Sequence, residues 1–252
     1  MKKLASIVLI LFFLPLIAAA DIYDDFFAFK IELYNQADAQ GSKTFLEKYK
    51  TSIETMTLTE EEKLTLVNLF ILEEMNTLKD ENGKPESKKI YKLLTQQNTA
   101  TEKFMQGKKK NAVTRWLLLS WADIKSRLTS FLSGQDMYKE AFASKELYEF
   151  VLKQNKKFSP AHISFGLWLF FAPPISGGGY DASLKEFSNA VSYAKNKNEK
   201  YYALCCRSQV YTALEQTKKA EEDLNEAHSL IQNENFTKII IEMNNHDKLF
   251  FE

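Results

Sequence analysis

The sequence predicts an all-α protein built from helices stacked in antiparallel pairs. Helix breakers are scarce, with 8 glycines and 5 prolines in 252 residues, and three of the glycines are consecutive. Leucine, lysine, glutamate and alanine, which favour helices, are abundant. One pattern of small and large side chains at helical spacing also recurs along the chain, which is typical of helices that stack on similar neighbours.

Helical periodicity extends over almost the whole chain after its first twenty residues. Thr59 and Glu62 form a capping-box pattern at the start of one helix. The segment DENGKPES at 80–87 predicts a turn, and Ser159 followed by Pro160 predicts the start of another helix. We expect helices at 22–38, 42–57, 59–78, 85–106, 110–133, 136–155, 160–172, 180–196, 198–214, 216–231 and 235–248.

Residues 1–20, MKKLASIVLILFFLPLIAAA, have the pattern of a secretory signal peptide. Lys2 and Lys3 form its basic start, residues 4–13 are apolar, and small residues precede a cleavage site after Ala20. Cleavage would release an exported protein with no stable membrane span, most simply into a bacterial periplasm. The alternative is an uncleaved N-terminal anchor, because the apolar run is close to the shortest length that spans a bilayer.

Four of the predicted helices carry the same stripe of side chains. A small residue is followed four positions later by an aromatic residue or leucine, and three positions after that by a small or aliphatic residue. Positions with this spacing lie on one face of a helix, and small residues there let a neighbouring helix approach closely. The stripes are Ser87-Tyr91-Leu94, Ser144-Tyr148-Val151, Ser183-Phe187-Ala190 and Ala220-Leu224-Ala227.

These stripes resemble the second helix of tetratricopeptide (TPR) repeats, which are helix–turn–helix units of about 34 residues. In 201–234, Ser208 and Tyr211 match the first helix of the repeat, and the last of the four stripes matches the second. The match is partial, because Leu204 and Gln232 stand where the family has tryptophan and proline. The resemblance implies a TPR-like α-solenoid of stacked antiparallel helix pairs.

The resemblance also suggests how the chain is divided. After the signal peptide, we expect a divergent N-terminal helical segment at 21–110 and a TPR-like helical array at 111–252. Within that array, 235–248 would be the C-terminal capping helix that covers the exposed end. The predicted helix at 110–133 departs from the usual repeat length, so the array is expected to be divergent.

The stretch FFAPPISGGGY at 170–180 lengthens the connection between two predicted helices. Pro173 and Pro174 cannot continue a helix, and the three glycines that follow permit the positive φ angles of a reversing chain. We therefore expect a turn. The alternative is anion binding at the start of the next helix.

In TPR proteins the first helix of each pair lines a concave groove, which identifies a candidate binding site here. The helix 160–172 is apolar on all sides and must be covered, either by the N-terminal helices or by a ligand or partner. In the second case Phe165 and Trp168 would belong to an apolar pocket. The groove positions carried over from the family are Ile163, Leu167, Phe170, Phe171, Tyr202, Cys205, Gln209 and Thr212.

Catalytic and metal-binding patterns are not found in the sequence. His162, His228 and His246 lack the spacing of paired metal ligands, so neither a metal nor a cofactor is expected, and His162 is interpreted as a core residue. The adjacent Cys205 and Cys206 are expected to be buried thiols, because a disulfide between neighbours is incompatible with a helix. Lysine plus arginine and aspartate plus glutamate number 33 each, a balance that gives no reason to expect nucleic-acid binding.

We therefore expect a non-catalytic, exported helical-repeat protein that mediates protein–protein interaction in the bacterial cell envelope. The alternative is the binding of a small hydrophobic ligand in an apolar cavity, as a periplasmic accessory to a transporter. That alternative is similar to the role of envelope TPR proteins that accompany TRAP-type transporters.

Overall fold

The computed structural model describes residues 23, 26–36, 39–232, 235–246 and 248. The predicted signal peptide at 1–20, with its cleavage site after Ala20, lies outside these residues. Within the described ranges the chain forms eleven α-helices and no β-strand, which confirms the predicted all-α fold. The helices are α1 (Phe26–Tyr34), α2 (Ala39–Thr55), α3 (Glu60–Thr77), α4 (Ser87–Met105), α5 (Arg115–Leu128), α6 (Gly134–Gln154), α7 (Ser159–Phe171), α8 (Tyr180–Tyr193), α9 (Lys197–Ala213), α10 (Thr217–Leu230) and α11 (Asn235–Asn245).

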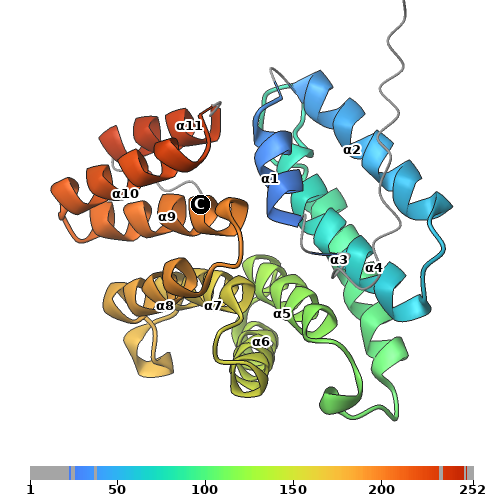
Figure 1. Cartoon of the computed structure of the whole chain (residues 1–252). Coiled ribbons are helices and arrows are strands. Elements are labelled where there is room, and N and C mark those ends of the chain that lie inside the picture. Colours follow the sequence, from blue (N-terminus) through green and yellow to red (C-terminus); the bar gives the residue numbers. More distant parts are fainter. Residues whose placement is uncertain (1–22, 24–25, 37–38, 233–234, 247, 249–252) are drawn as a thin grey trace, which may run out of the picture.

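Helices that follow one another in the chain pack against one another, as in a solenoid (Figure 1). The most extensive packing is between α5 and α6, between α7 and α8, and between α9 and α10. The α9–α10 pair is fastened by Arg207, whose Nε and Nη2 donate to the two carboxylate oxygens of Asp223 at 2.7 and 2.6 Å. At the C-terminal end α11 packs against both α9 and α10, in the place expected of a capping helix.

The array closes on itself, because the N-terminal helix returns to the C-terminal helices. The helix α1 packs against α9 and α11 as well as against α2 (Figure 1). At its end, the backbone N–H of Asn235 donates to Oδ1 of Asn35, and the side-chain amide of Asn235 donates to the carbonyl of Asn35, both at 3.2 Å. These two residues are separated by 200 positions in the sequence. The interior of the curved array is therefore partly occupied by its own first helix.

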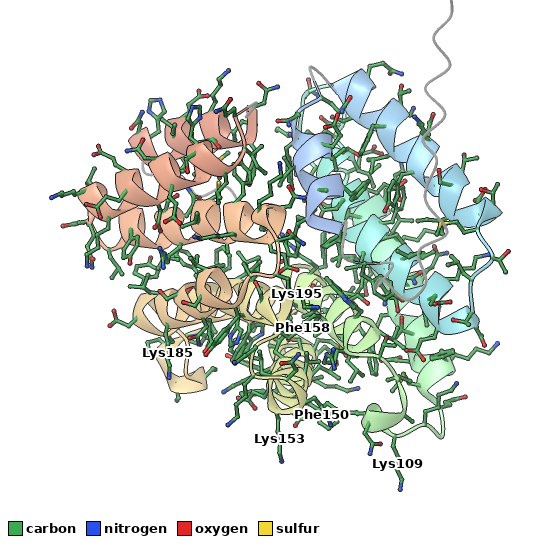
Figure 2. The ribbon with its side chains drawn as sticks, viewed as in Figure 1. Lys109, Phe150, Lys153, Phe158, Lys185 and Lys195 are labelled. Atoms are coloured by element: carbon green, nitrogen blue, oxygen red, sulfur yellow. The ribbon has the colours of Figure 1, made fainter. Side chains whose placement is uncertain are left out.

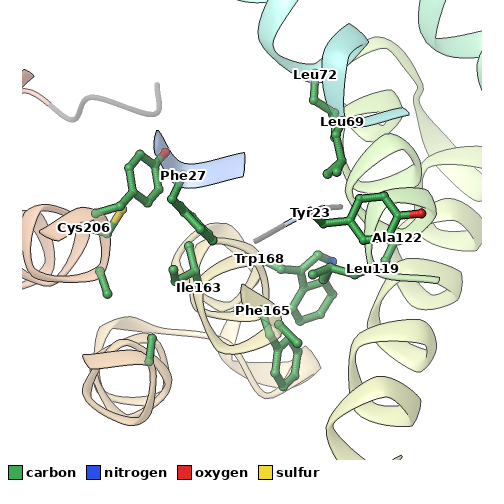
Figure 3. Close-up of a cluster of buried hydrophobic side chains, with 14 of the residues drawn as sticks. Tyr23, Phe27, Leu69, Leu72, Leu119, Ala122, Ile163, Phe165, Trp168 and Cys206 are labelled. Atoms are coloured by element: carbon green, nitrogen blue, oxygen red, sulfur yellow. The ribbon is translucent and has the colours of Figure 1, made fainter. Parts of the chain in front are cut away.

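Apolar side chains from five helices meet where α1 enters the array. Figure 3 shows Phe27 of α1 between Cys206 of α9 and Ile163 of α7, and Tyr23 beside Ala122 of α5. All five side chains are buried. Figure 2 shows the opposite situation at the surface, where lysines project outward from the helices. Burial of these apolar side chains is the main stabilising contribution that holds α1 in place.

Three of the four predicted stripes lie in the core as expected. Every member of the stripes on α6, α8 and α10 is buried. The α7–α8 contact illustrates why small residues are needed, because Ser183 Oγ donates to the carbonyl of Gly166 at 2.8 Å. A Cβ atom added at Gly166 would lie 3.1 Å from the ring of Phe187, so the two helix axes approach closely.

The prediction that the whole stripe Ser87-Tyr91-Leu94 is buried is wrong. Ser87 is exposed and Tyr91 is 41% exposed, so only Leu94 of this stripe is buried. The face that α4 turns to α3 and α5 contains Ile90, Leu94, Gln97 and Thr101 instead. Polar partners on the neighbouring helix set this orientation, since Gln97 Nε2 and Thr101 Oγ1 both donate to Oδ1 of Asn68 on α3.

The single long helix predicted at 110–133 is also wrong. The structure has a 3-10 turn at Lys110–Ala112, the 14-residue helix α5, and a second 3-10 turn at Thr129–Phe131. Thr114 caps the start of α5, where its side chain accepts a hydrogen bond from the N–H of Leu117. Threonine at such a position offers the backbone an alternative to helix continuation, which periodicity alone does not reveal.

The glycine-containing stretch forms a compact turn between α7 and α8. A 3-10 turn at Pro174–Ser176 is followed by Gly177 and Gly179, whose φ angles are 83° and 120°. The N–H of Gly179 donates to the carbonyl of Leu169 at 2.8 Å, which ties the turn to the end of α7. A Cβ atom at Gly178 would lie 2.0 Å from the carbonyl oxygen of Ala172, so only glycine fits there. From 26 to 232, apart from 37–38, and in α11, no helix has the length and apolar character required to cross a membrane.

Candidate functional site

A large pocket of about 1240 Å³ lies in the interior of the curved array. Its walls come from α1, α3, α5, α6 and α7, with one residue from α9, Tyr202, and two from α11, Ile239 and Met243. The turn after α7 contributes Ala172, Pro173 and Ser176 to the rim. A cavity of this size, with both apolar and polar side chains, is large enough to hold an organic ligand of moderate size.

One wall of the pocket is apolar and partly open to solvent. It is formed by Tyr138 and Phe142 of α6 and by Leu167, Trp168 and Phe171 of α7. Three of these aromatic side chains, Tyr138, Phe142 and Phe171, are 55, 48 and 53% exposed. Large aromatic side chains this exposed on two neighbouring helices indicate a surface that would lose water on binding.

The floor of the pocket contains a carboxylate held by two hydroxyl groups. Tyr148 donates from its hydroxyl to Oδ1 of Asp123 at 2.8 Å, and Ser164 Oγ donates to Oδ2 at 3.0 Å. Burial raises the pKa of Asp123 to about 6, although these two hydrogen bonds and the charges of Lys30 and Arg127 lower it. Burial also raises the pKa of Tyr148 well above its usual value, so its hydroxyl remains a donor.

A second polar group on the floor is an ion pair between α1 and α3. Lys30 Nζ lies 2.7 Å from Oε1 of Glu73, whose side chain is only 3% exposed, and the hydroxyl of Tyr34 donates to Oε2 at 3.2 Å. Burial lowers the pKa of Lys30, but the Glu73 carboxylate, Tyr34 and Cys206 together raise it by more, so the net pKa lies above the usual value. Lys30 Nζ also lies 4.6 Å from the ring centre of Tyr202. The charges of this pair are therefore compensated within the protein.

Arg127 supplies a further positive charge on α5, one turn after Asp123. Its side chain is half-buried and lines the pocket. Its charge lowers the pKa of Asp123, but among the described residues its side chain makes neither a hydrogen bond nor an ion pair. A guanidinium group has five donors, so this side chain can still bind acceptor atoms.

The pocket brings together part of the predicted groove. Ile163, Leu167 and Phe171 of α7 line it, as do Tyr202 of α9 and Trp168 from the predicted apolar pocket. Phe165 does not line it, but packs against Tyr148 and Trp168, with ring centres 5.6 and 6.0 Å apart. Four groove positions therefore converge, together with one of the two proposed pocket residues.

The remaining groove positions lie elsewhere. Phe170 is buried against Phe171 and Tyr180, with ring centres 5.2 and 4.8 Å apart. On α9, Cys205 is buried, and Gln209 donates to Oδ1 of Asn244 in α11. Thr212 lines a separate, smaller hollow of about 400 Å³ between α9, α10 and α11. Because α11 packs against the C-terminal part of α9, Gln209 and Thr212 do not reach the large pocket.

The N-terminal helix fills the part of the groove nearest to α9. The rings of Phe27 and Tyr202 have centres 5.4 Å apart, and Tyr202 stacks on Phe236 of α11 at the same distance with an interplanar angle of 3°. The N-terminal segment also covers part of the apolar helix 160–172, since Phe27 lies beside Ile163 (Figure 3), and a cavity remains further along that helix.

Sequence reasoning missed the charged residues of the site. Lys30 stands in FFAFKIELY and Glu73 in NLFILEEM, so each is a charge next to a long apolar run. Asp123 and Arg127 stand one helical turn apart in WADIKSR. Burying a charge on the apolar face of a helix costs free energy unless the charge is paired. A charged residue within an apolar run was therefore the signal by which the sequence could have indicated these site residues.

The histidine and cysteine residues have structural positions. His162 is buried, with Nδ1 at 2.5 Å from Oε2 of Glu186 and Nε2 at 2.9 Å from the carbonyl of Lys156. Cys205 and Cys206 are buried free thiols, and burial raises the pKa of both, that of Cys206 to about 12. Over the described ranges no three His, Cys, Asp or Glu residues are placed to hold a metal ion.

The fold and the pocket together define an all-α array of sequentially packed helices with an internal cavity. No protein-family model matches the sequence, and no curated protein has significant similarity to it.

Proposed function

We propose that this protein is an exported, non-catalytic binding protein that holds a small molecule with an apolar body in its central pocket. The observation that carries the proposal is the pocket itself, with about 1240 Å³ between apolar side chains of α6 and α7 and polar groups of α1, α3 and α5. Binding sites for small molecules are commonly apolar cavities with a few fixed polar groups that orient the ligand. Among the polar groups here, Lys30, Glu73 and Asp123 are fixed by an ion pair or hydrogen bonds to other helices.

The helical array is proposed to be of the tetratricopeptide type. The stripes on α6, α8 and α10 are buried at the contacts between consecutive helices, and the small residue Gly166 meets Phe187 of the following helix. An array of this type presents an inner surface that can enclose a ligand. Together with the signal-peptide pattern of residues 1–20, this supports a role as a periplasmic accessory to a transporter.

The pocket can be tested with a neutral apolar dye such as Nile red, added to the protein that begins at Asp21. We expect saturable fluorescence enhancement, which the substitution Ala141→Phe should weaken because Ala141 lines the pocket. Ala143→Phe is the matched control, since Ala143 lies on the same helix but does not line the pocket. Enhancement that does not saturate, or that both variants change equally, would contradict the proposal.

A second candidate function, the binding of another envelope protein, is favoured by apolar side chains beyond the rim of the pocket. Ile175 in the turn after α7 is 96% exposed, and Tyr180 at the start of α8 is also exposed. The substitution Ile175→Asp should abolish capture of a specific envelope protein without changing dye binding. Capture that is unchanged by Ile175→Asp would count against a partner at this rim.

A further inference from the structure

We propose that the ligand of the central pocket is an organic acid, whose anionic group binds to Arg127 while its apolar body lies against α6 and α7. This inference rests on the proposed function and specifies the chemical class of the ligand. It follows from the distribution of charges and donors in the pocket floor.

Two of the three charged centres of the floor already have partners. The Lys30 ammonium faces Glu73 at 2.7 Å, and the second oxygen of Glu73 accepts a hydrogen bond from Tyr34. Asp123 has one hydroxyl donor at each carboxylate oxygen. These groups are positioned by the protein and need no ligand to satisfy them.

Arg127 differs from both, because its donors meet no acceptor among the described residues. It is half-buried and lines the pocket, so its charge is partly removed from water. A partly buried cation whose donors meet no acceptor gains most from an anionic ligand, and the planar guanidinium suits the two oxygens of a carboxylate. Ser126 and Ser130, also lining the pocket, provide neighbouring hydroxyl groups on the same side.

The opposite wall indicates that the anion is attached to an apolar body. Phe142, Leu167, Trp168 and Phe171 face the same cavity and offer aromatic and aliphatic surface. A small inorganic anion would contact Arg127 but leave this surface and most of the volume unfilled. A ligand that joins an acidic group to an apolar body would use both walls at once.

A cationic ligand directed to Asp123 is the competing arrangement. Both oxygens of that carboxylate already accept hydrogen bonds from Tyr148 and Ser164, and Arg127 lies on the same helix one turn away. An amine placed at Asp123 would therefore have to compete with two hydroxyl donors, whereas an anion at Arg127 would meet donors that have no acceptor among the described residues. This difference in hydrogen-bond partners favours an anion over a cation.

Three fluorescent probes that share a pyrene body and differ in the charged or neutral group at the end of its chain test the inference: 4-(pyren-1-yl)butanoate, its primary amide and 4-(pyren-1-yl)butylamine. We expect the acid to bind about tenfold or more tightly than the amide, as one charge-assisted hydrogen-bonded contact would give. Arg127→Met should remove this preference and leave amide binding within about twofold, whereas Arg127→Lys should retain part of it. Arg115→Met is the matched control, because Arg115 lies on the same helix and does not line the pocket.

The outcomes separate the two proposals. Equal binding of acid and amide would overturn the inference but support an apolar pocket, and strongest binding of the amine would overturn it in favour of Asp123. An acid preference that survives Arg127→Met would also overturn it. Failure of all three probes to bind would count against both the inference and the proposed function. Circular dichroism melting curves establish that each variant is folded.

Discussion

Lys30 of α1 and Glu73 of α3 form an ion pair across the inner end of the pocket, with 2.7 Å between Nζ and Oε1. The pair joins the N-terminal helix to the array in which it is embedded. It also lies beside Tyr34 and Tyr202, so the surroundings are largely shielded from water. The position of α1 therefore depends on a buried polar contact in addition to apolar packing.

Lys30→Met should strongly destabilise the protein, because it leaves the Glu73 carboxylate buried without its counter-charge. We expect the free energy of unfolding in urea to fall by about 3 kcal/mol or more. The double variant Lys30→Met/Glu73→Met should recover most of that loss. Lys89→Met removes the exposed ion pair with Glu86 and should cost less than about 1 kcal/mol. If both lysine variants lose the same free energy of unfolding, the buried ion pair contributes no more to stability than the exposed one.

Stability should depend on the protonation of Asp123. Burial raises the pKa of this carboxyl group to about 6, against about 3.9 in an unfolded chain, so the folded state binds the proton more tightly. Its stabilising contribution is therefore complete below about pH 4 and is lost as the pH rises through about 6. In urea unfolding between pH 4 and 7.5, the stability of the wild type relative to Asp123→Asn should fall by roughly 2 kcal/mol as the pH rises. A difference that does not change with pH would contradict this.

Phe187 and Tyr91 occupy the same position of the predicted stripe but have different environments. Phe187 is fully buried against α7, whereas Tyr91 is partly exposed on α4. Phe187→Ala should lower the free energy of unfolding by about 3 to 5 kcal/mol. Tyr91→Ala should cost about 1 kcal/mol or less, because little buried surface is lost. Comparable losses in chemical denaturation would mean that the α4 stripe packs as first expected.

Cys205 and Cys206 should be unreactive in the folded protein. Both are buried, and burial raises the pKa of each thiol, so neither the accessibility nor the thiolate needed for reaction is provided. Labelling with a thiol reagent at pH 8 should proceed at the rate of global unfolding and reach two thiols in denaturant. Rapid labelling of one thiol in the native state would show that α9 opens locally.

Gly178→Ala should disturb the turn that forms the rim of the pocket. The added Cβ atom would lie 2.0 Å from the backbone oxygen of Ala172, so the turn must shift. We expect a loss of about 1 to 3 kcal/mol and weaker dye binding, since Ala172 and Ser176 line the pocket. Ile175→Ala alters an exposed side chain of the same turn and should leave stability within about 0.5 kcal/mol. If Gly178→Ala leaves the dye affinity unchanged, the turn does not contribute to the shape of the binding pocket.

Part of the candidate site was predictable from the sequence. Ile163, Leu167, Trp168, Phe171 and Tyr202 were identified from an apolar helix and a repeat pattern, and all five line the pocket. Both signals are local, because they depend on which residues share a face of one helix. The same reasoning placed Ser87 and Tyr91 incorrectly, since their stripe has the right spacing but the neighbours of α4 lie against a different face.

The charged floor could not be found in this way. Lys30, Glu73, Asp123 and Arg127 come from three helices that are adjacent only after the array has closed. Nothing in the spacing of the sequence indicates that Lys30 meets Glu73, or that Tyr148 and Ser164 converge on one carboxylate. These pairings depend on the path of the whole chain.

By itself, the sequence determined most of the helices, the tight turn after α7 and the buried faces of α6, α8 and α10, because periodicity and backbone preferences act over a few residues. Only the tertiary structure decided that α1 folds back between α3 and α9, and that a cavity remains between it and α7. The physical reason is that the closed arrangement is stabilised by contacts between residues distant in the chain, such as Phe27 with Tyr202 and Asn35 with Asn235.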